Sequence, residues 1–217
     1  MGFLDRRDAG RQLAGKLAPY QGDNPIILAL PRGGVPVAVE ISEALGAPLD
    51  LVLVRKIGVP QQPELAAGAV VGDGEPIVVR NEDIIRMAQV SEADFNRVKE
   101  AEIAEIRRRL ALYVGDRPHP ALEDRTVIVV DDGVATGATV RAALQALRKH
   151  QPRLLVLAVP VAPTDTIEEL RKLADRVECL ETHTPFGAIG YYYADFRQVA
   201  DEEVIEALAR TTPDLPH

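Results

Sequence analysis

The sequence predicts an α/β fold in which a doubly wound, mainly parallel sheet of five strands is flanked by helices. Short apolar runs rich in Val, Ile and Leu alternate along the chain with segments of helical periodicity, at the spacing of β-α units. In the run at 49–56 the Val and Leu residues show no alternation with polar ones, as expected of a parallel strand covered on both faces. We expect one domain over residues 1–217.

The first part of the chain supplies a lead-in helix, a strand, a helix and a second strand. A helical pattern follows Asp5, a suitable N-cap, and ends before Pro19. The apolar run at 25–30 predicts a strand, and the pattern after it, which closes on Gly46, predicts a helix. The run at 49–56 predicts the second strand.

The middle of the chain departs from this alternation. Gly and Pro are dense after residue 56, which predicts a flexible loop and a hairpin over about 57–80, turned at Gly-Asp-Gly. Residues 91–113 then form an apolar helical stripe, which indicates a helix covering the sheet rather than a coiled coil, since only about three heptads are available. The stripe comprises Phe95, Val98, Ile103, Ile106, Leu110 and Tyr113.

The remainder of the chain returns to alternating strands and helices. Three further apolar runs predict strands, and three helical patterns lie between and after them. The strands are expected at 126–130, 153–161 and 175–181, and the helices at 138–150, 165–174 and 200–210.

Composition favours a small-molecule enzyme. The chain has 25 Lys and Arg against 33 Asp and Glu, and this net charge of -8 argues against nucleic-acid binding, which depends on clustered positive charge. Cys179 is the only cysteine, so no disulfide within the chain or Cys-rich metal site is expected. We expect a cytoplasmic protein without a membrane partner, since the sequence shows neither a signal-peptide core nor a run of about 18 apolar residues.

Two adjacent aspartates, Asp131 and Asp132, come directly after the predicted strand at 126–130. Ligands of open parallel sheets bind beyond the carboxyl ends of the strands, so this position favours a binding role. Neighbouring carboxylates repel each other unless a cation or several hydroxyl donors face them.

The segment that follows the aspartates is suited to bind a phosphate. It turns tightly and opens a helix, which offers backbone N–H groups, hydroxyls and the positive end of a helix dipole. Acceptors for hydroxyls followed by donors for a phosphate match a pentose 5-phosphate whose 2- and 3-hydroxyls face the carboxylates. The expected phosphate-binding residues are Ala135, Thr136, Gly137, Ala138 and Thr139.

The stretch VIVVDDGVATGAT at 127–139 resembles the motif with which type I phosphoribosyltransferases bind phosphoribosyl pyrophosphate (PRPP). The alternative is a dinucleotide-binding turn that happens to carry acids, but neither a G-x-G-x-x-G after a strand nor a G-x-x-x-x-G-K-[ST] loop is present. RKIGVPQQPELAAGAV (55–70) and FGAIGYYYADFRQVADEEV (186–204) also resemble a set of bacterial phosphoribosyltransferases of unassigned acceptor. The resemblance therefore covers most of the chain and implies the type I phosphoribosyltransferase fold with a small hood.

The resemblance also implies a separate pyrophosphate site. The PRGG stretch follows the first strand and opens a helix, so the amides of Gly33 and Gly34 and the Arg32 guanidinium are placed to bind phosphate oxygens. Family members often hold a non-proline cis peptide in this loop, here near Arg32 and Gly33. Arg55 and Lys56 match a position where the family keeps a basic residue that reaches pyrophosphate, although Lys56 also fits a solvated strand end.

In the family, pyrophosphate leaves through an oxocarbenium-like transition state, so catalysis consists mostly of electrostatic help to the leaving group and positioning of an incoming nitrogen. Mg2+ is implied as cofactor, held largely by PRPP oxygens and water, with Asp131 or Asp132 as a direct or water-bridged ligand. The implied catalytic residues are Arg32, Lys56, Asp131 and Asp132.

The acceptor base is less well defined. Ala135 stands where relatives acting on 6-oxopurines usually have an Asp, so hypoxanthine and guanine are disfavoured and the loop looks more like that of adenine phosphoribosyltransferases. A hood over about 182–200 concentrates aromatic residues in a chain with only 4% of them, and these either stack an acceptor ring or anchor the segment to the sheet. The candidate acceptor contacts are Phe186, Tyr191, Tyr192, Tyr193, Asp195 and Glu64.

Three functions stay open at this point. The first is a phosphoribosyltransferase that uses PRPP, Mg2+ and a nitrogenous base, both substrates being small molecules. The second is a regulator that binds PRPP without turnover, and the third is a sugar-phosphate hydrolase. A homodimer is compatible with each of them.

Overall fold

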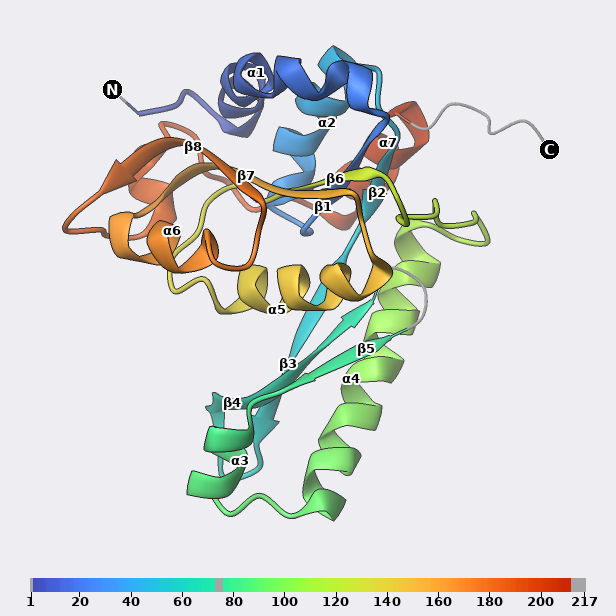
Figure 1. The fold of residues 1–217 in the computed structure, drawn as a ribbon, viewed down its shortest axis with the longest axis vertical. Helices are drawn as coiled ribbons and strands as arrows, with labels where there is room; N and C mark the ends of the chain where they lie inside the picture. The colour runs from blue at the N-terminus through green and yellow to red at the C-terminus, as the bar shows by residue number, and fades with distance from the viewer. Residues whose placement is uncertain (1, 73–75, 212–217) are drawn as a thin grey trace.

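A five-stranded parallel sheet forms the centre of the computed structural model, which describes residues 2–72 and 76–211 (Figure 1). The strand order is β2-β1-β6-β7-β8, and every neighbouring pair is parallel, so the predicted fold class is confirmed. The strands are β1 (Pro25–Ala29), β2 (Leu49–Leu51), β6 (Thr126–Val130), β7 (Leu154–Pro163) and β8 (Arg176–His183).

Both faces of the sheet are buried at its central strands β1, β6 and β7, which explains the lack of polar alternation in these three strands, whereas the edge strand β8 is partly exposed. Ile27 of β1 lies opposite Ile128 of β6, and both belong to one hydrophobic cluster. The next pair along, Leu28 and Val129, belongs to a second cluster. Because successive side chains point to opposite faces of a strand, a strand covered on both faces supplies apolar residues at nearly every position.

Helices cover the two faces in separate layers, as Figure 1 shows. The first cluster is closed by α1 (Arg6–Leu17), α2 (Gly34–Leu45) and α7 (Asp201–Thr211), and the second by α5 (Ala138–Leu147) and α6 (Thr164–Leu170). Short 3-10 helices complete the connections: η1 (Ala18–Asp23), η2 (Arg148–His150) and η3 (Ile189–Tyr192).

The predicted ends of the first two helices are confirmed. Asp5 caps α1, since its side chain accepts a hydrogen bond from the backbone N–H of Asp8 at 2.7 Å. Gly46 ends α2 in the left-handed conformation with φ +62°, which glycine adopts without steric cost.

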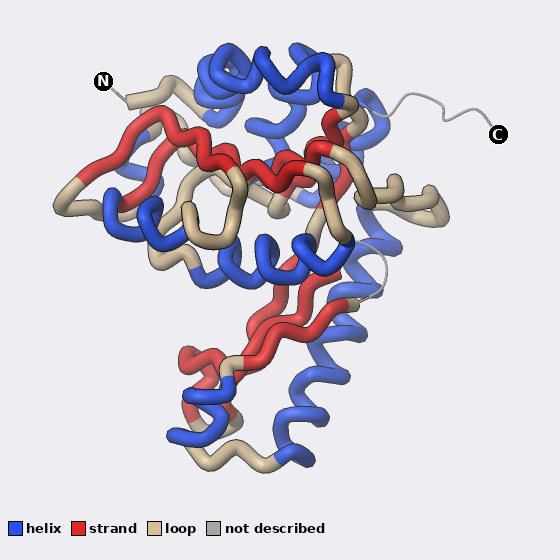
Figure 2. The backbone as a smooth tube through the Cα atoms, viewed as in Figure 1, coloured by secondary structure: helices blue, strands red, loops and turns tan. Residues whose placement is uncertain are grey.

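After β2 the chain leaves the main sheet and forms a second unit, here called the arm. The arm comprises β3 (Leu53–Val59), β4 (Gln62–Gly72), β5 (Ile77–Arg80), α3 (Glu82–Met87) and α4 (Glu92–Tyr113). Its three strands make an antiparallel sheet that projects away from the main sheet in Figures 1 and 2. The predicted single strand at 49–56 was therefore wrong, because the run divides between two sheets at Val52.

Strands also occupy the segment where a flexible loop was expected. Gly58 interrupts the β3–β4 register as a bulge, and a Cβ atom there would lie 2.6 Å from the carbonyl oxygen of Pro63. The glycine thus permits a close approach of two strands instead of marking a loop. The expected hairpin is present between β4 and β5. Its turn was predicted at Gly-Asp-Gly, residues 72–74, of which 73 and 74 lie outside the described residues.

The long helix α4 covers the arm and not the main sheet. Its buried residues Phe95, Ile106 and Leu110 join the first cluster beside Ile57 and Val70 of the arm strands. The expectation of a helix on the main sheet was wrong because the antiparallel strands needed a cover of their own. On its other face the arm packs against α5, which therefore lies between the two sheets.

No helix in the two described ranges combines the length and apolar character needed to cross a membrane.

Candidate active site

The two loops that the sequence singled out follow neighbouring strands at the centre of the main sheet. From β1 the chain connects to β2 on one side, whereas β6 lies on the other side, so the winding direction reverses between β1 and β6. Loops diverge at such a switch point and leave a crevice beyond the carboxyl ends of the strands. Residues 31–34 follow β1 and residues 131–137 follow β6, and we call the region beside these two loops the switch-point crevice.

These loops touch each other, and two glycines make the contact possible. A Cβ atom on Gly33 would lie 2.1 Å from Oδ2 of Asp132, and one on Gly34 would lie 2.6 Å from the carbonyl oxygen of Val130. The peptide bond between Pro31 and Arg32 is cis, next to the position that the family resemblance implied. The PRGG loop and the aspartates therefore form one continuous surface.

Asp132 is bound by an arginine that sequence analysis missed. Arg6, at the start of α1, donates from Nε to Oδ2 of Asp132 at 2.7 Å, and each side chain is only 11% exposed. The Arg6 guanidinium also donates to the carbonyl of Arg197 at 2.8 Å and lies 3.9 Å from the centre of the Phe196 ring. One cation thus joins α1, the hood and the aspartate pair. A separation of 126 residues left no local sequence signal for this pair.

Asp131 is half-buried, and no ion pair to it forms in the described part of the chain. Its Oδ1 accepts a hydrogen bond from the backbone N–H of Asp132 at 2.9 Å. Burial, followed by the negative charge of Asp132, raises the pKa of Asp131 well above its ordinary value. Burial also raises the pKa of Asp132, against the opposing effect of Arg6. The pair therefore favours a ligand that brings hydroxyl donors or a cation.

The expected phosphate loop ends where α5 begins. Gly137 is the N-cap residue and has φ +74°, so the loop turns through a conformation that suits glycine. Thr136 is exposed and Thr139 is half-buried, and a hydrogen bond from Thr166 of α6 to the carbonyl of Ala135, at 3.2 Å, supports the turn. The first N–H groups of α5 lack a side-chain cap, which suits an anion at this helix end.

Arg32 is oriented by two residues distant in sequence. Its Nη1 donates to Oδ1 of Asp201, the first residue of α7, at 3.2 Å. The same oxygen accepts a hydrogen bond from the hydroxyl of Tyr113, the last residue of α4, at 2.6 Å.

Arg55 and Lys56 do not meet at one site. They are consecutive in β3, so their side chains point to opposite faces of the arm. Arg55 donates to Oε2 of Glu102 on α4 at 2.6 Å, which places it away from α5. Lys56 lines a cavity of about 490 Å³ between the arm and α5, together with Ala138 and Arg141. Both residues were expected at pyrophosphate, but the pleat of the strand directs their side chains to different sites.

The hood packs as a hydrophobic cluster against the N-terminal residues. Tyr193 forms a β-bridge with Phe3, is 7% exposed, and donates its hydroxyl to the carbonyl of Asp132 at 2.5 Å. Burial raises the pKa of Tyr193, so the hydroxyl stays a donor. The Tyr192 ring stacks on His183 at 4.4 Å and on Phe186 at 5.0 Å between ring centres. These contacts agree with the anchoring alternative for the aromatic cluster.

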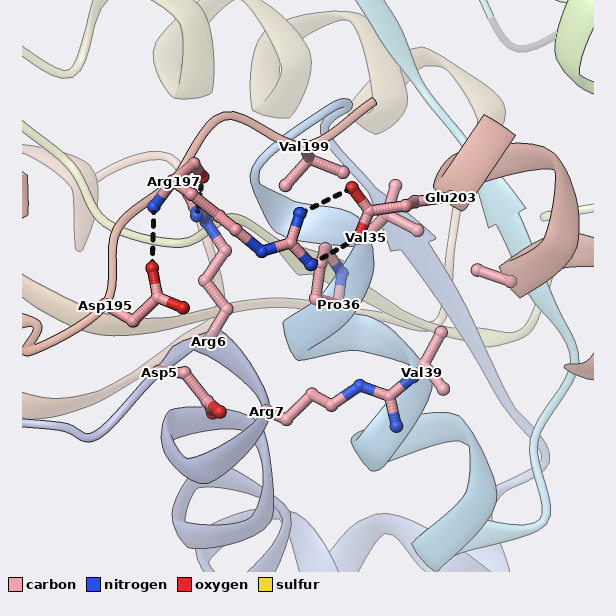
Figure 3. A pocket seen from close by; sticks show the side chains of 11 residues that line it. Asp5, Arg6, Arg7, Val35, Pro36, Val39, Asp195, Arg197, Val199 and Glu203 are labelled. Carbon is pink, nitrogen blue, oxygen red and sulfur yellow. Dashed lines mark hydrogen bonds and ion pairs between the residues drawn. The ribbon is translucent and has the colours of Figure 1, made fainter. Parts of the chain in front are cut away.

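The two acidic candidates for acceptor binding lie in different places. Asp195 lines a cavity of about 120 Å³ between α1, α2 and α7, shown in Figure 3, where its Oδ1 accepts from the backbone N–H of Arg197 at 3.1 Å. In the same cavity Arg197 binds Glu203 through two hydrogen bonds of 2.9 and 2.8 Å. Glu64 is exposed near the β3–β4 turn, at the end of the arm remote from β2, so it is not brought to the crevice.

The chain matches known proteins along nearly all of its length. The family model described as phosphoribosyl transferase domain matches residues 5–195. Two Mycobacterium tuberculosis proteins named as phosphoribosyl transferases, from strains CDC 1551 / Oshkosh and ATCC 25618 / H37Rv, are each 45% identical over 213 residues, which is 98% of this chain and 48% of theirs. The chain therefore spans about half the length of these relatives. The crystal structure of TT1426 from Thermus thermophilus is 42% identical, has a TM-score of 0.86, and matches over 98% of this chain and 100% of its own.

Proposed function

The chain belongs to the phosphoribosyl transferase family, and from that premise we propose that it transfers the 5-phosphoribosyl group of PRPP to a nitrogenous base and releases pyrophosphate. The observation that supports this most is the switch-point crevice itself. The aspartate pair lies between the PRGG loop, which touches Asp132, and the uncapped start of α5, which follows the pair along the chain. In PRPP the diol likewise lies between the pyrophosphate and the 5-phosphate.

Binding follows from the polarity of each wall of the crevice. The N–H groups and hydroxyls of residues 135–139 bind the 5-phosphate, because a helix start favours negative charge. Asp131 accepts hydrogen bonds from the ribose hydroxyls, which return the stabilisation that its carboxylate lacks in the free protein. Asp132 is already bound by Arg6, and its side chain supports the PRGG loop at Gly33.

The reaction then depends on charge that develops on the leaving pyrophosphate. The amides of Gly33 and Gly34 and the free edge of the Arg32 guanidinium stabilise that charge, and Lys56, which faces α5 from the arm, is the candidate for a further cation. The two amides and the Arg32 guanidinium are held before the substrate arrives, so little reorganisation of these groups is needed as the bond to pyrophosphate breaks. Positioning of the incoming nitrogen completes the step.

A Mg2+ ion fits the crevice in chemical terms. Asp131 and Asp132 supply hard oxygen ligands, and among the described residues no group of three or more His, Cys, Asp and Glu side chains is arranged as a complete metal cage. An ion bound there would take its remaining ligands from PRPP and water, and it would neutralise phosphate charge. Asp131 is the candidate ligand, since Asp132 already binds Arg6.

For the acceptor we propose a nitrogenous base other than a 6-oxopurine. Ala135 is exposed at the crevice and carries no group that could exchange a proton with a purine ring. The bases to be examined first are adenine and other rings without a 6-oxo group.

Incubation of the protein with PRPP, Mg2+ and a panel of bases tests this function, with pyrophosphate release and the nucleotide product as readouts. We expect release with at least one base, and a fall of about a hundredfold or more in kcat/KM for Asp131→Asn. Asp116→Asn, in the exposed loop after α4, is the matched control and should leave the rate unchanged. Failure of every base to release pyrophosphate would contradict the proposal.

A regulator that binds PRPP without turnover is the second candidate. One observation favours it: Arg32 and Arg55 already bind Asp201 and Glu102, so two of the cations expected at pyrophosphate have protein partners. Tight PRPP binding without pyrophosphate release from any base would establish this alternative. Release of ribose 5-phosphate in place of a nucleotide would instead indicate a hydrolase.

A further inference from the structure

Three residues from distant parts of the chain meet beside the PRGG loop: Arg32, Tyr113 and Asp201. Oδ1 of Asp201 accepts from Nη1 of Arg32 at 3.2 Å and from the hydroxyl of Tyr113 at 2.6 Å. Tyr113 is 6% exposed and belongs to the first hydrophobic cluster, so the packing of its ring fixes the position of its hydroxyl. The ends of α4 and α7 thus converge on the one arginine of the candidate pyrophosphate site.

The Arg32 guanidinium is held on one side only. It has five N–H donors, and within residues 2–72 and 76–211 only Nη1 makes a hydrogen bond. The edge formed by Nε and Nη2 stays available, and such an edge binds two oxygens of a phosphate at once. Because the side chain is 32% exposed, a ligand in the crevice can reach it.

The charge states suit a permanent contact. The hydrogen bond from Tyr113, followed by that from Arg32, lowers the pKa of Asp201, so this carboxylate is ionised at neutral pH. Burial and the bond to Asp201 raise the pKa of Tyr113 to about 12, so its hydroxyl remains a donor.

Stabilisation of the start of α7 does not by itself explain this arrangement. Glu202 and Glu203 share the first turn with Asp201 and serve the helix dipole equally well. Glu203 binds Arg197, and Glu202 is exposed. Asp201 alone among these three acids contacts the PRGG loop.

We propose that Asp201, oriented by Tyr113, is a positioning residue for Arg32: it holds Nη1 so that the Nε–Nη2 edge faces the pyrophosphate group of the substrate. This inference rests on the proposed function and extends it to two residues outside the motif. Asp201 itself does not touch the substrate. Its effect should therefore appear in pyrophosphate binding and not in binding of the other end of PRPP.

Titration calorimetry with Mg2+ and either pyrophosphate or ribose 5-phosphate tests this division. For Asp201→Asn we expect the Kd of pyrophosphate to rise about tenfold, because the amide keeps the shape but loses the charge that orients Arg32. The Kd of ribose 5-phosphate, which lacks pyrophosphate, should change less than about twofold. Glu202→Gln, the same loss of charge one residue along α7, should change neither value.

A double-mutant cycle separates positioning from general stability. If Asp201 acts through Arg32, then adding Asp201→Asn to Arg32→Ala should not weaken pyrophosphate binding further. Tyr113→Phe, which removes only the hydroxyl, should raise the Kd by about threefold in the presence of Arg32. Thermal unfolding of each variant checks that the fold is retained.

The outcomes are distinct for the two levels of the proposal. Wild-type affinity or tighter binding of pyrophosphate by Asp201→Asn would overturn the positioning role, and so would an equal loss of both ligands. If the wild-type protein binds ribose 5-phosphate but not pyrophosphate, the proposed transferase function fails and the role of Asp201 fails with it.

Discussion

The switch-point crevice and the arm each contain a pair of charged residues that are adjacent in sequence, but the fold places the two pairs differently. At the crevice, loops after two parallel strands meet because the strands are neighbours: Gly33 lies against the Asp132 side chain, and Gly34 lies against the backbone of Val130 and Asp131. In the arm, Arg55 and Lys56 are adjacent in sequence yet face α4 and α5 on opposite sides of a sheet. Proximity in sequence therefore indicates a shared site on a loop, but it indicates separation on a strand.

The two regions also differ in how their ion pairs are buried. Arg6 and Asp132 are each 11% exposed, whereas Arg55 and Glu102 are 36% and 20% exposed. A buried pair is costly to break because one charge is left without a partner, while a solvated pair contributes little. We therefore expect the two ion pairs to differ most in their contribution to the free energy of unfolding.

The largest expected effect is on stability when the crevice pair is broken. Arg6→Gln leaves Asp132 buried without its cation and should lower the free energy of unfolding by about 3 kcal/mol. Arg55→Gln in the arm should cost less than about 1 kcal/mol, and so should Arg7→Gln, whose guanidinium is 51% exposed and lies 3.5 Å from Glu40. Urea unfolding measures all three, and equal losses for Arg6 and Arg55 would remove the distinction between the regions.

The next effect concerns the contact between the two loops of the crevice. In Gly34→Ala the new methyl group meets the Val130 carbonyl and the Cα atom of Asp131, which belong to backbone and cannot turn aside. We expect a loss of about 2 kcal/mol in stability together with weaker PRPP binding. Gly15→Ala is the matched control, because this exposed position in α1 has no atom within 4 Å of the added Cβ. It should be neutral or slightly stabilising, so destabilisation of both variants alike would contradict the packing argument.

A smaller effect tests the division within the arm. Lys56→Gln should raise the Kd of pyrophosphate, measured in the presence of Mg2+, about tenfold, because an exposed ammonium facing α5 is lost. Arg55→Gln should change it less than about twofold, since its guanidinium binds Glu102 on the other face. Calorimetry on both variants measures the difference. A larger effect for Arg55 would show that the arm presents its opposite face to the ligand.

The smallest expected effect is a gain in stability. Because the pKa of Asp131 is raised in the folded protein, the folded state binds more protons than the unfolded state from about pH 4 upward to that raised value, and stability falls as the pH rises through this window. Asp131→Asn removes this cost, so we expect it to be more stable than the wild type at about pH 7, by on the order of 1 kcal/mol. The gain should vanish near pH 4, which thermal unfolding across this range would reveal. A gain that is independent of pH would argue against titration of Asp131.

Much of the fold could be predicted because its signals are local. The five parallel strands follow from apolar runs, and the ends of α1 and α2 follow from a capping aspartate and a glycine. The division of the run at 49–56 could not be predicted, since a strand buried in either sheet needs the same Val and Leu residues. Gly58 misled for a related reason, as a bulge and a loop both require glycine.

The sequence by itself determined the strand and helix order, the placement of Asp131 and Asp132 at a strand end, and the glycines that let the PRGG loop approach them. These features depend on patterns a few residues long, which determine the local backbone conformation without distant contacts. Only the tertiary structure decided that Arg6 binds Asp132 and that Asp201 and Tyr113 hold Arg32. It also decided that the side chains of Arg55 and Lys56 lie on opposite faces of the arm. Each of these follows from long-range packing, in which the partner is chosen by how helices close over a sheet and not by the neighbouring residues of the chain.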